Sequence, residues 1–285
     1  SQIKNPDALV STSKSFLLVH LNYGVSKCNL FTFYLLVFST ISFFVFINAI
    51  GPFVLETYLH YPKGQQGQAL GDIAFFNEIF GLLIPYLWGA ISDKLGRKIV
   101  FSAGFLFMAT AVAVYPFAPW LWVLILFRLV FAIGGSATGS MLTACLGDYS
   151  CPRDRGKASG IMGIMSGLGA IFAAILLLRI PGWVSLLTTQ TIAGYVTFGF
   201  VAIFGIVCAI LALIGLKGKI TKIYHDTNLI RIIIDGIIAG VKNPTVTLAY
   251  FASFAARGDA VLITTFLTLW VNQTMLKHGH SEAEA

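Results

Sequence analysis

The sequence predicts an all-α membrane protein with seven membrane helices among its 285 residues. Hydrophobic residues make up 57% of the chain and charged residues only 11%, whereas soluble domains carry about a quarter charged residues. The apolar residues fall into separate runs of roughly twenty, the length that a helix needs to cross a bilayer. Lysines and arginines lie mainly in short segments between these runs, with no continuous basic face, which argues against a nucleic-acid-binding protein.

The composition changes three times along the chain and divides it into four segments. The first is a polar lead-in, with an amphipathic interfacial helix expected around residues 15–25. The second holds six apolar runs. The third is basic, and its isoleucine-rich stretch is too short to span a bilayer, so an interfacial amphipathic helix is expected there. The fourth holds a seventh apolar run and the start of an external loop. The segments are residues 1–28, 29–216, 217–244 and 245–285.

The ends of the membrane helices coincide with polar or helix-breaking residues. The first helix closes at Gly51 and Pro52, before a polar, glycine-rich external loop at 56–70. The second ends in a highly charged turn. Pro116 and Pro119 mark a very short turn between the third and fourth. The seven helices are expected at about residues 30–51, 72–91, 100–117, 120–146, 158–178, 192–216 and 246–271.

The basic residues predict the orientation of the chain. Cytoplasmic loops of membrane proteins carry an excess of lysine and arginine, so the richer side, which includes the N-terminus, is expected in the cytoplasm. That side carries Lys4, Lys14, Lys27, Lys94, Arg97, Lys98, Arg153, Arg155, Lys157, Lys217, Lys219, Lys222, Arg231 and Lys242. The opposite side carries Lys63, Arg179 and Lys277.

The turn between the second and third helices, residues 89–98, has the most specific pattern in the chain. Gly89 is expected to let its helix pack closely against a neighbour, and Gly96 to let the backbone reverse direction. The charged residues can form an ionic latch at the membrane surface, where water relieves the cost of desolvation. A generic basic turn is the alternative. The charged residues are Asp93, Lys94, Arg97 and Lys98.

This pattern, G-x-x-x-D-[RK]-x-G-[RK]-[RK], resembles the signature loop between helices two and three of the major facilitator superfamily of transporters. The resemblance covers about residues 30–271 and implies a major facilitator-type helical bundle, with seven of an expected twelve helices. The chain is then either a fragment or a truncated family member, which a missing C-terminal half or a partner chain would complete. The close of the first helix, residues 51–55, looks nearest to the drug:proton branch.

Two further stretches are similar to the superfamily. In the loop after the fourth helix, Asp148 and Arg155 match charges that pair with the turn at 89–98 and close the cytoplasmic gate. The resemblance therefore implies one gating network of Asp148, Arg155, Asp93 and Arg97, and surface charges in a turn are the alternative. Arg128 resembles the helix-four motif R-x-x-x-G-x-G, implicated in proton coupling, although Ala132 replaces its first glycine.

Ionisable residues inside membrane helices are costly and usually face a cavity or a partner. Glu78 and Arg128 are expected at matching depth, so an ion pair between them is feasible. A carboxylate that loses its partner in an apolar medium takes up a proton, which makes Glu78, Arg128 and Asp259 candidates for proton coupling. A static pair that only orients two helices is the alternative. By analogy with the superfamily, the substrate path includes Asn48, Arg128, Arg257 and Asp259.

These observations predict a secondary active transporter that moves a small solute by alternating access, coupled to protons. A facilitative uniporter is one alternative, because the antiporter signature of helix five is missing, and a non-transporting subunit or receptor is another. No nucleophile and base are paired as in an enzyme, and no cofactor is expected. The four cysteines, Cys28, Cys145, Cys151 and Cys208, show no C-x-x-C spacing, so no metal site is expected.

Overall fold

The structure of the protein is a computed structural model. It describes residues 15–16, 18–218, 238, 241–261, 263, 267, 270, 271 and 274.

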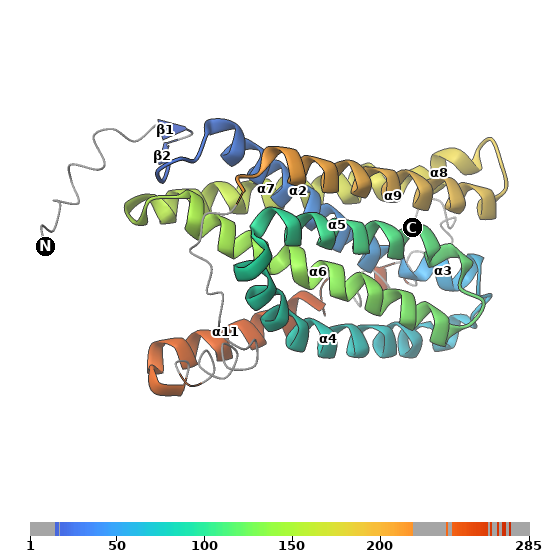
Figure 1. The fold of residues 1–285 in the computed structure, drawn as a ribbon. Coiled ribbons are helices and arrows are strands. Elements are labelled where there is room, and N and C mark those ends of the chain that lie inside the picture. The colour runs from blue at the N-terminus through green and yellow to red at the C-terminus, as the bar shows by residue number, and fades with distance from the viewer. Residues whose placement is uncertain are drawn as a thin grey trace, which may run out of the picture.

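A short antiparallel hairpin precedes a bundle of helices (Figure 1). The hairpin pairs β1 (Ser15–Phe16) with β2 (Val19–His20). The longer helices are α2 (Lys27–Ala49), α4 (Gln66–Leu95), α5 (Arg97–Val114), α6 (Leu121–Tyr149), α7 (Arg155–Ile175), α9 (Gln190–Gly215) and α11 (Pro244–Val261). The shorter elements are α3 (Gly51–Thr57), α8 (Ile180–Ser185), η1 (Lys63–Gln65), η2 (Tyr115–Phe117), η3 (Pro152–Asp154) and η4 (Leu177–Arg179).

Six helical stretches in the described part are long and apolar enough to cross a membrane. They are α2, α4, α5 with η2, α6, the run from η3 to α8, and α9. The predicted all-α membrane fold is therefore confirmed. Of the seventh predicted helix, the structure describes α11, and most of residues 262–271 lie outside the described residues, as does most of the expected connector helix.

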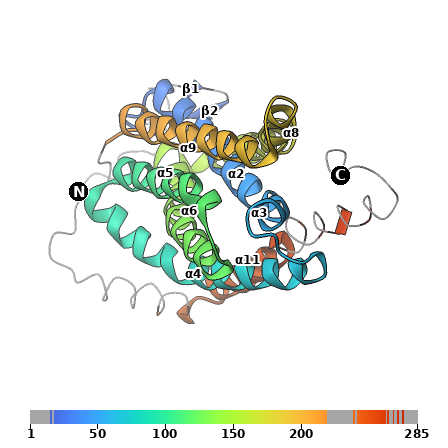
Figure 2. The same cartoon turned by 90° about the vertical axis from the view of Figure 1, so that its right-hand side faces the viewer.

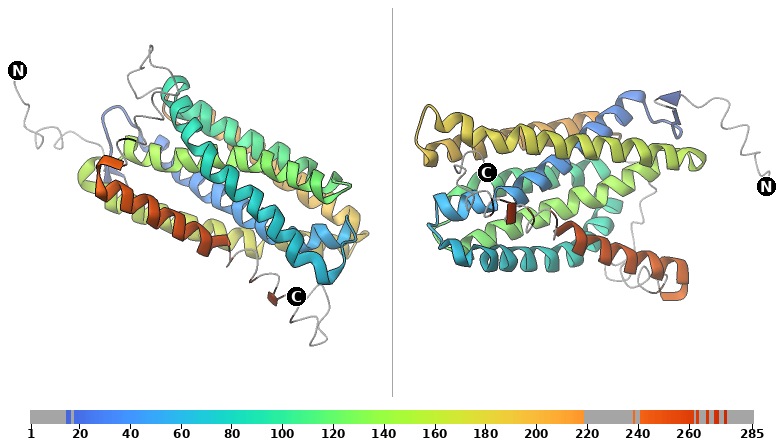
Figure 3. Two further views of the ribbon diagram at one scale, coloured as in Figure 1. Left: turned by 90° about the horizontal axis from the view of Figure 1, so that it is seen from below. Right: turned by 180° about the vertical axis from the view of Figure 1, so that it is seen from behind.

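The most buried of these helices is α2, and α4 and the run containing α7 are the least buried. Figure 2 shows α5 between α6 and α9, and Figure 3 shows α2 crossing the bundle obliquely. Phe43 on α2 contacts Phe105 on α5 and Phe204 on α9, with ring centroids 6.1 and 5.7 Å apart. This aromatic contact holds three helices together at the centre of the core.

Small residues let α5 and α6 approach closely. A Cβ atom on Gly134 would lie 2.5 Å from the carbonyl oxygen of Gly104, so the two backbones touch at this point. Hydroxyl and indole groups join other helix pairs: Ser102 Oγ donates to the carbonyl of Ala209 at 2.9 Å, and Trp88 Nε1 to that of Ile133 at 2.9 Å. Close approach and hydrogen bonds of this kind are the usual means of joining helices in lipid.

The N-terminal hairpin corrects one expectation, because residues 15–25 do not form an interfacial helix. Leu18 and Gly24 have φ values of 64° and 74°, which interrupt a helix. The backbone instead pairs with the loop between α6 and α7: Asn22 N donates to the carbonyl of Tyr149, and Cys151 N to that of His20, both at 3.0 Å. The helical pattern failed here because these backbone groups bond to a segment far away in the sequence.

Side chains strengthen this attachment, which we call the N-terminal clamp (residues 19–23). The Nδ1 atom of His20 lies 2.5 Å from Asp154 Oδ2. The amide of Asn22 donates to the carbonyls of Asp148 and Ser150 at 2.9 and 3.2 Å. The clamp therefore ties the start of the chain to the loop between α6 and α7.

Replacing Asn22 by alanine should weaken the clamp. The change removes side-chain donors to two carbonyls, and a hydrogen bond of this kind contributes about 1 kcal/mol. The two bonds together contribute about 2 kcal/mol, so we expect the melting temperature in detergent to fall by about 4–8 °C. Tyr23→Ala is the control, because the Tyr23 side chain is fully exposed. Equal losses in the two variants would show that the amide adds nothing to the clamp.

Two boundaries also differ from the predictions. The second membrane helix begins at Gln66 and not at residue 72, so the external loop is shorter than residues 56–70. The first membrane helix ends at Ala49, and a separate short helix, α3, follows from Gly51. Hydropathy marks the part of a helix that crosses hydrocarbon, whereas polar turns at its ends lie outside that part.

Candidate functional site

The turn between α4 and α5 meets the end of α6 through three charged side chains. Arg97 Nη1 lies 2.9 Å from Asp93 Oδ1, and Arg97 Nε lies 3.0 Å from Asp148 Oδ2. The Arg97 side chain is only 14% exposed, so these contacts are less screened than those of a surface pair. We call Asp93, Arg97 and Asp148 the charge network. It links the end of α6 to the turn that precedes α5.

The other residues expected in the gate lie around this network without joining it in the same way. Arg155 Nη2 lies 3.5 Å from the carbonyl oxygen of Gly147, so its guanidinium contacts the backbone of α6. Gly96 has a φ of 97°, which favours glycine where α4 turns into α5. Lys94 and Lys98 lie on the same turn.

The expected close packing at Gly89 is not found. Among the described residues, a Cβ atom at this position would meet nothing within 4 Å. The reason is that α4 is one of the least buried helices of the bundle, and Gly89 lies where no described helix covers it. The glycine therefore makes no close helix contact in the part of the chain that the structure describes.

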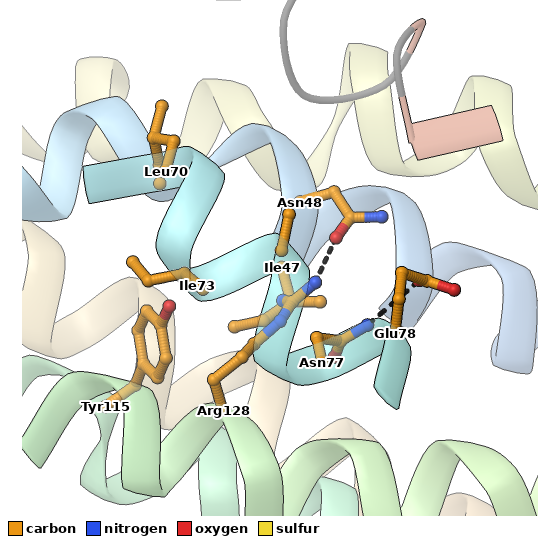
Figure 4. Close-up of a pocket in the computed structure, with 10 residues that line it drawn as sticks. Ile47, Asn48, Leu70, Ile73, Asn77, Glu78, Tyr115 and Arg128 are labelled. Carbon is orange, nitrogen blue, oxygen red and sulfur yellow. Dashed lines mark hydrogen bonds between the residues drawn. The ribbon is translucent and has the colours of Figure 1, made fainter. Parts of the chain in front are cut away.

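A second group of predicted residues meets inside the bundle, around a cavity of about 30 Å³ (Figure 4). Asn48 comes from α2, Glu78 from α4 and Arg128 from α6. Three membrane helices thus each contribute a polar side chain to one small space. Apolar side chains that include Ile47, Leu70 and Ile73 line the rest.

Arg128 is the most deeply buried of these groups, with 5% of its surface exposed. Its Nη2 donates to Asn48 Oδ1, and its Cζ lies 5.3 Å from the centre of the Phe131 ring. An aromatic face stabilises a nearby cation, most strongly where water is excluded. Nε and Nη1 of Arg128 are buried and have no hydrogen-bond partner in the described structure.

Glu78 is partly buried and lines the same cavity. Its Oε1 accepts a hydrogen bond from the side-chain amide of Asn77 at 3.2 Å. Its carboxylate lies near enough to attract the guanidinium of Arg128, whose hydrogen bond goes to Asn48. A carboxylate and a guanidinium from two different helices thus line one cavity.

Two predicted residues are not placed by the structure. Arg257 and Asp259 lie on α11, and their side chains are outside the described residues. Asn77 and Tyr115 also line the cavity and were not predicted from the sequence. Asn77 is polar and lies beside Glu78 in an apolar run, a signal that could have identified it. Tyr115 lies beside Pro116 and looked like part of a turn, so nothing in its surroundings pointed inward.

A family model decides the identity of this bundle. The model described as the Major Facilitator Superfamily matches residues 32–281, most of the chain. The chain belongs to the Major Facilitator Superfamily. Members of this superfamily are membrane transporters, and the match includes the six apolar helices, the charge network and the cavity around Arg128.

Individual superfamily proteins are similar to this chain at low identity. Magnetosome protein MamH of Paramagnetospirillum magneticum is 26% identical over 264 residues, which are 88% of this chain and 58% of MamH. Multidrug resistance protein 3 of Bacillus subtilis is 29% identical over 119 residues, 39% of this chain and 23% of that protein. The match to MamH spans most of this chain, and the multidrug match only part of it.

A solved structure shares the fold. It is the crystal structure of the peptide transporter POT in complex with sulfate. The match covers 93% of this chain and 52% of the transporter's chain, with a TM-score of 0.53 and 16% sequence identity. The chain thus spans about half the length of MamH and of this peptide transporter.

Proposed function

We propose that this protein is a secondary transporter, and not an enzyme, which moves a small solute across a membrane by alternating access. Proton coupling through Glu78 supplies the energy. The solute, the proton and the lipid bilayer are then its partners. Membership of a transporter superfamily supports the general role, and the polar cavity inside the bundle supports the site.

The observation that carries this proposal is the meeting of Glu78, Arg128 and Asn48 inside the bundle (Figure 4). Charged side chains within membrane helices are expensive and tend to lie on a solute or proton path. A carboxylate near a guanidinium stays ionised, and it takes up a proton when a conformational change separates the two. Alternate pairing and protonation of Glu78 would couple proton movement to the rocking of the bundle.

The charge network supports a gate at the end that carries the basic residues. Arg97 joins the α4–α5 turn to the end of α6. From the excess of lysine and arginine at this end, we infer that the N-terminus and the network face the cytoplasm. Closing and opening of the network would then control access to the cavity from the cytoplasm.

Transport by intact protein in proteoliposomes tests the proposal. A pH-sensitive dye is enclosed, and ethidium, citrate, sulfate and a dipeptide are added in turn with and without a pH gradient. We expect at least one solute to move with protons. Glu78→Gln should abolish the pH dependence of that transport, because glutamine carries no titrating proton.

Two results would revise the proposal. Retained pH dependence in Glu78→Gln would exclude Glu78 as the coupling group. If the wild type and Glu78→Gln both transport a solute at rates that do not depend on the pH gradient, the protein is a facilitative uniporter. The matched control is Glu56→Gln on α3, which removes a carboxylate outside the cavity.

A further inference from the structure

Arg128 keeps unused hydrogen-bond donors in a place where they are costly. Its side chain is 95% buried, and among the described residues only its Nη2 has a hydrogen-bond partner, the amide oxygen of Asn48. Nε and Nη1 are buried without a partner in the described structure. Buried donors that remain unpaired destabilise a protein, so such donors usually bind a ligand or an ordered water molecule.

The cavity beside Arg128 fits a small oxygen-bearing group. Its volume of about 30 Å³ is large enough for a water molecule or for a group the size of a carboxylate. The amides of Asn48 and Asn77 add neutral polar groups, and the side chains of Ile47, Leu70 and Ile73 line the apolar part of the wall. Arginine is the residue best suited to hold carboxylate or phosphate oxygens.

We propose that Arg128 binds the anionic group of the transported solute, which carries a carboxylate or another oxyanion. This inference rests on the proposed transport function and adds the chemical class of its solute. Nη1 of Arg128 donates to the oxyanion, while the neighbouring Nη2 stays bonded to Asn48. The Phe131 face keeps the guanidinium oriented towards the cavity while the solute enters and leaves.

Glu78 gives this site its dependence on pH. The carboxylate lines the same cavity, so in its ionised form it repels an oxyanion that approaches Arg128. Protonation of Glu78 removes that repulsion, and the anion and the proton therefore bind together. The other titratable groups that line the cavity, among the described residues, are Tyr115 from η2 and Arg128 from α6.

Direct binding to the intact, purified protein tests the inference. Calorimetric titrations use sulfate and succinate as oxyanions, with glycerol and choline as neutral and cationic comparisons. We expect sulfate or succinate to bind, and Arg128→Gln to weaken that binding by at least tenfold, about the loss of one charge-assisted contact. Arg128→Lys should keep part of the affinity. Sulfate and succinate together show whether the site prefers a tetrahedral or a planar oxyanion.

A second variant, for which a gain of affinity is expected, tests the inference even if Arg128→Gln fails to fold. Glu78→Gln should bind sulfate about three- to tenfold more tightly at pH 7, because it removes a like charge from the cavity. Sulfate keeps its charge between pH 5 and pH 8. In the wild type its affinity should rise as the pH falls, and in Glu78→Gln that rise should disappear. Arg179→Gln, which removes an exposed arginine outside the cavity, is the control.

Several outcomes would overturn the inference. Unchanged oxyanion binding in Arg128→Gln would place the anion elsewhere, and weaker binding in Glu78→Gln would contradict the repulsion. No oxyanion binding to the wild type would mean that water alone satisfies Arg128. Glu78-dependent transport of ethidium without any anion binding would leave the proposed transport function intact and remove only this inference.

Discussion

Replacing Gly134 by alanine is expected to destabilise the protein strongly. The added methyl group would lie 2.5 Å from the carbonyl oxygen of Gly104, 2.7 Å from the Cβ of Phe107 and 2.8 Å from the backbone nitrogen of Met108. These atoms belong to the backbone or lie next to it, so α5 and α6 must move apart. Overpacking of this kind costs roughly 1–3 kcal/mol. We expect the melting temperature in detergent to fall by roughly 2–12 °C.

Gly139→Ala on the same helix is the matched control. Among the described residues, nothing lies within 4 Å of a Cβ atom at this position. Alanine is favoured over glycine within a helix by roughly 0.5–1 kcal/mol, so this change should leave stability unchanged or raise it slightly. If both variants lose a similar amount of stability, the contact at Gly134 does not set the distance between α5 and α6.

Replacing Arg97 by glutamine is expected to reduce transport by about tenfold or more while the helical bundle stays folded. The change removes the cation that lies between Asp93 and Asp148, and the two carboxylates then repel each other. A bias of about 1.4 kcal/mol against the closed gate changes the ratio of the two states tenfold. The transport rate and the melting temperature should be measured on the same preparation.

A double-mutant cycle separates the gate from general effects of charge. Asp148→Asn alone should also slow transport, and the double variant Arg97→Gln/Asp148→Asn should lose less than the two single losses added together. Arg153→Gln removes an exposed arginine from the neighbouring loop and should have little effect. Transport losses that simply add would show that Arg97 and Asp148 act independently of each other.

The membrane helices were predictable from the sequence because hydropathy marks the stretches that need a lipid environment. The same logic predicted Glu78 and Arg128 at matching depth, since a fixed rise per residue converts sequence position into height along a helix. Asn48 was expected nearby only by analogy with the superfamily. The sequence does not show which face each helix turns towards its neighbours, and that orientation decides which polar groups meet. Tyr115, which lies beside Pro116 in η2, was read as part of a turn and so was not expected in the cavity.

Other features depend on contacts between distant segments. Residues 15–25 have the composition of an interfacial helix, but hydrogen bonds from residues 19–23 to the distant loop between α6 and α7 form the N-terminal clamp instead. Gly89 resembled a packing residue because glycine in a membrane helix often is one, yet no described helix lies against it. In both cases the local pattern was consistent with the prediction, and the tertiary arrangement overruled it.

The N-terminal clamp sets an order of events during biosynthesis. His20 and Asp154 are 134 residues apart, and α2, α4, α5 and α6 lie between them. At roughly 5–20 residues per second, the ribosome needs roughly 7–27 seconds to make this stretch. Throughout that interval the loop that binds residues 19–23 has not yet been made. The clamp therefore forms only after α6 has been made. Once it has formed, the helices from α2 to α6 are already in place.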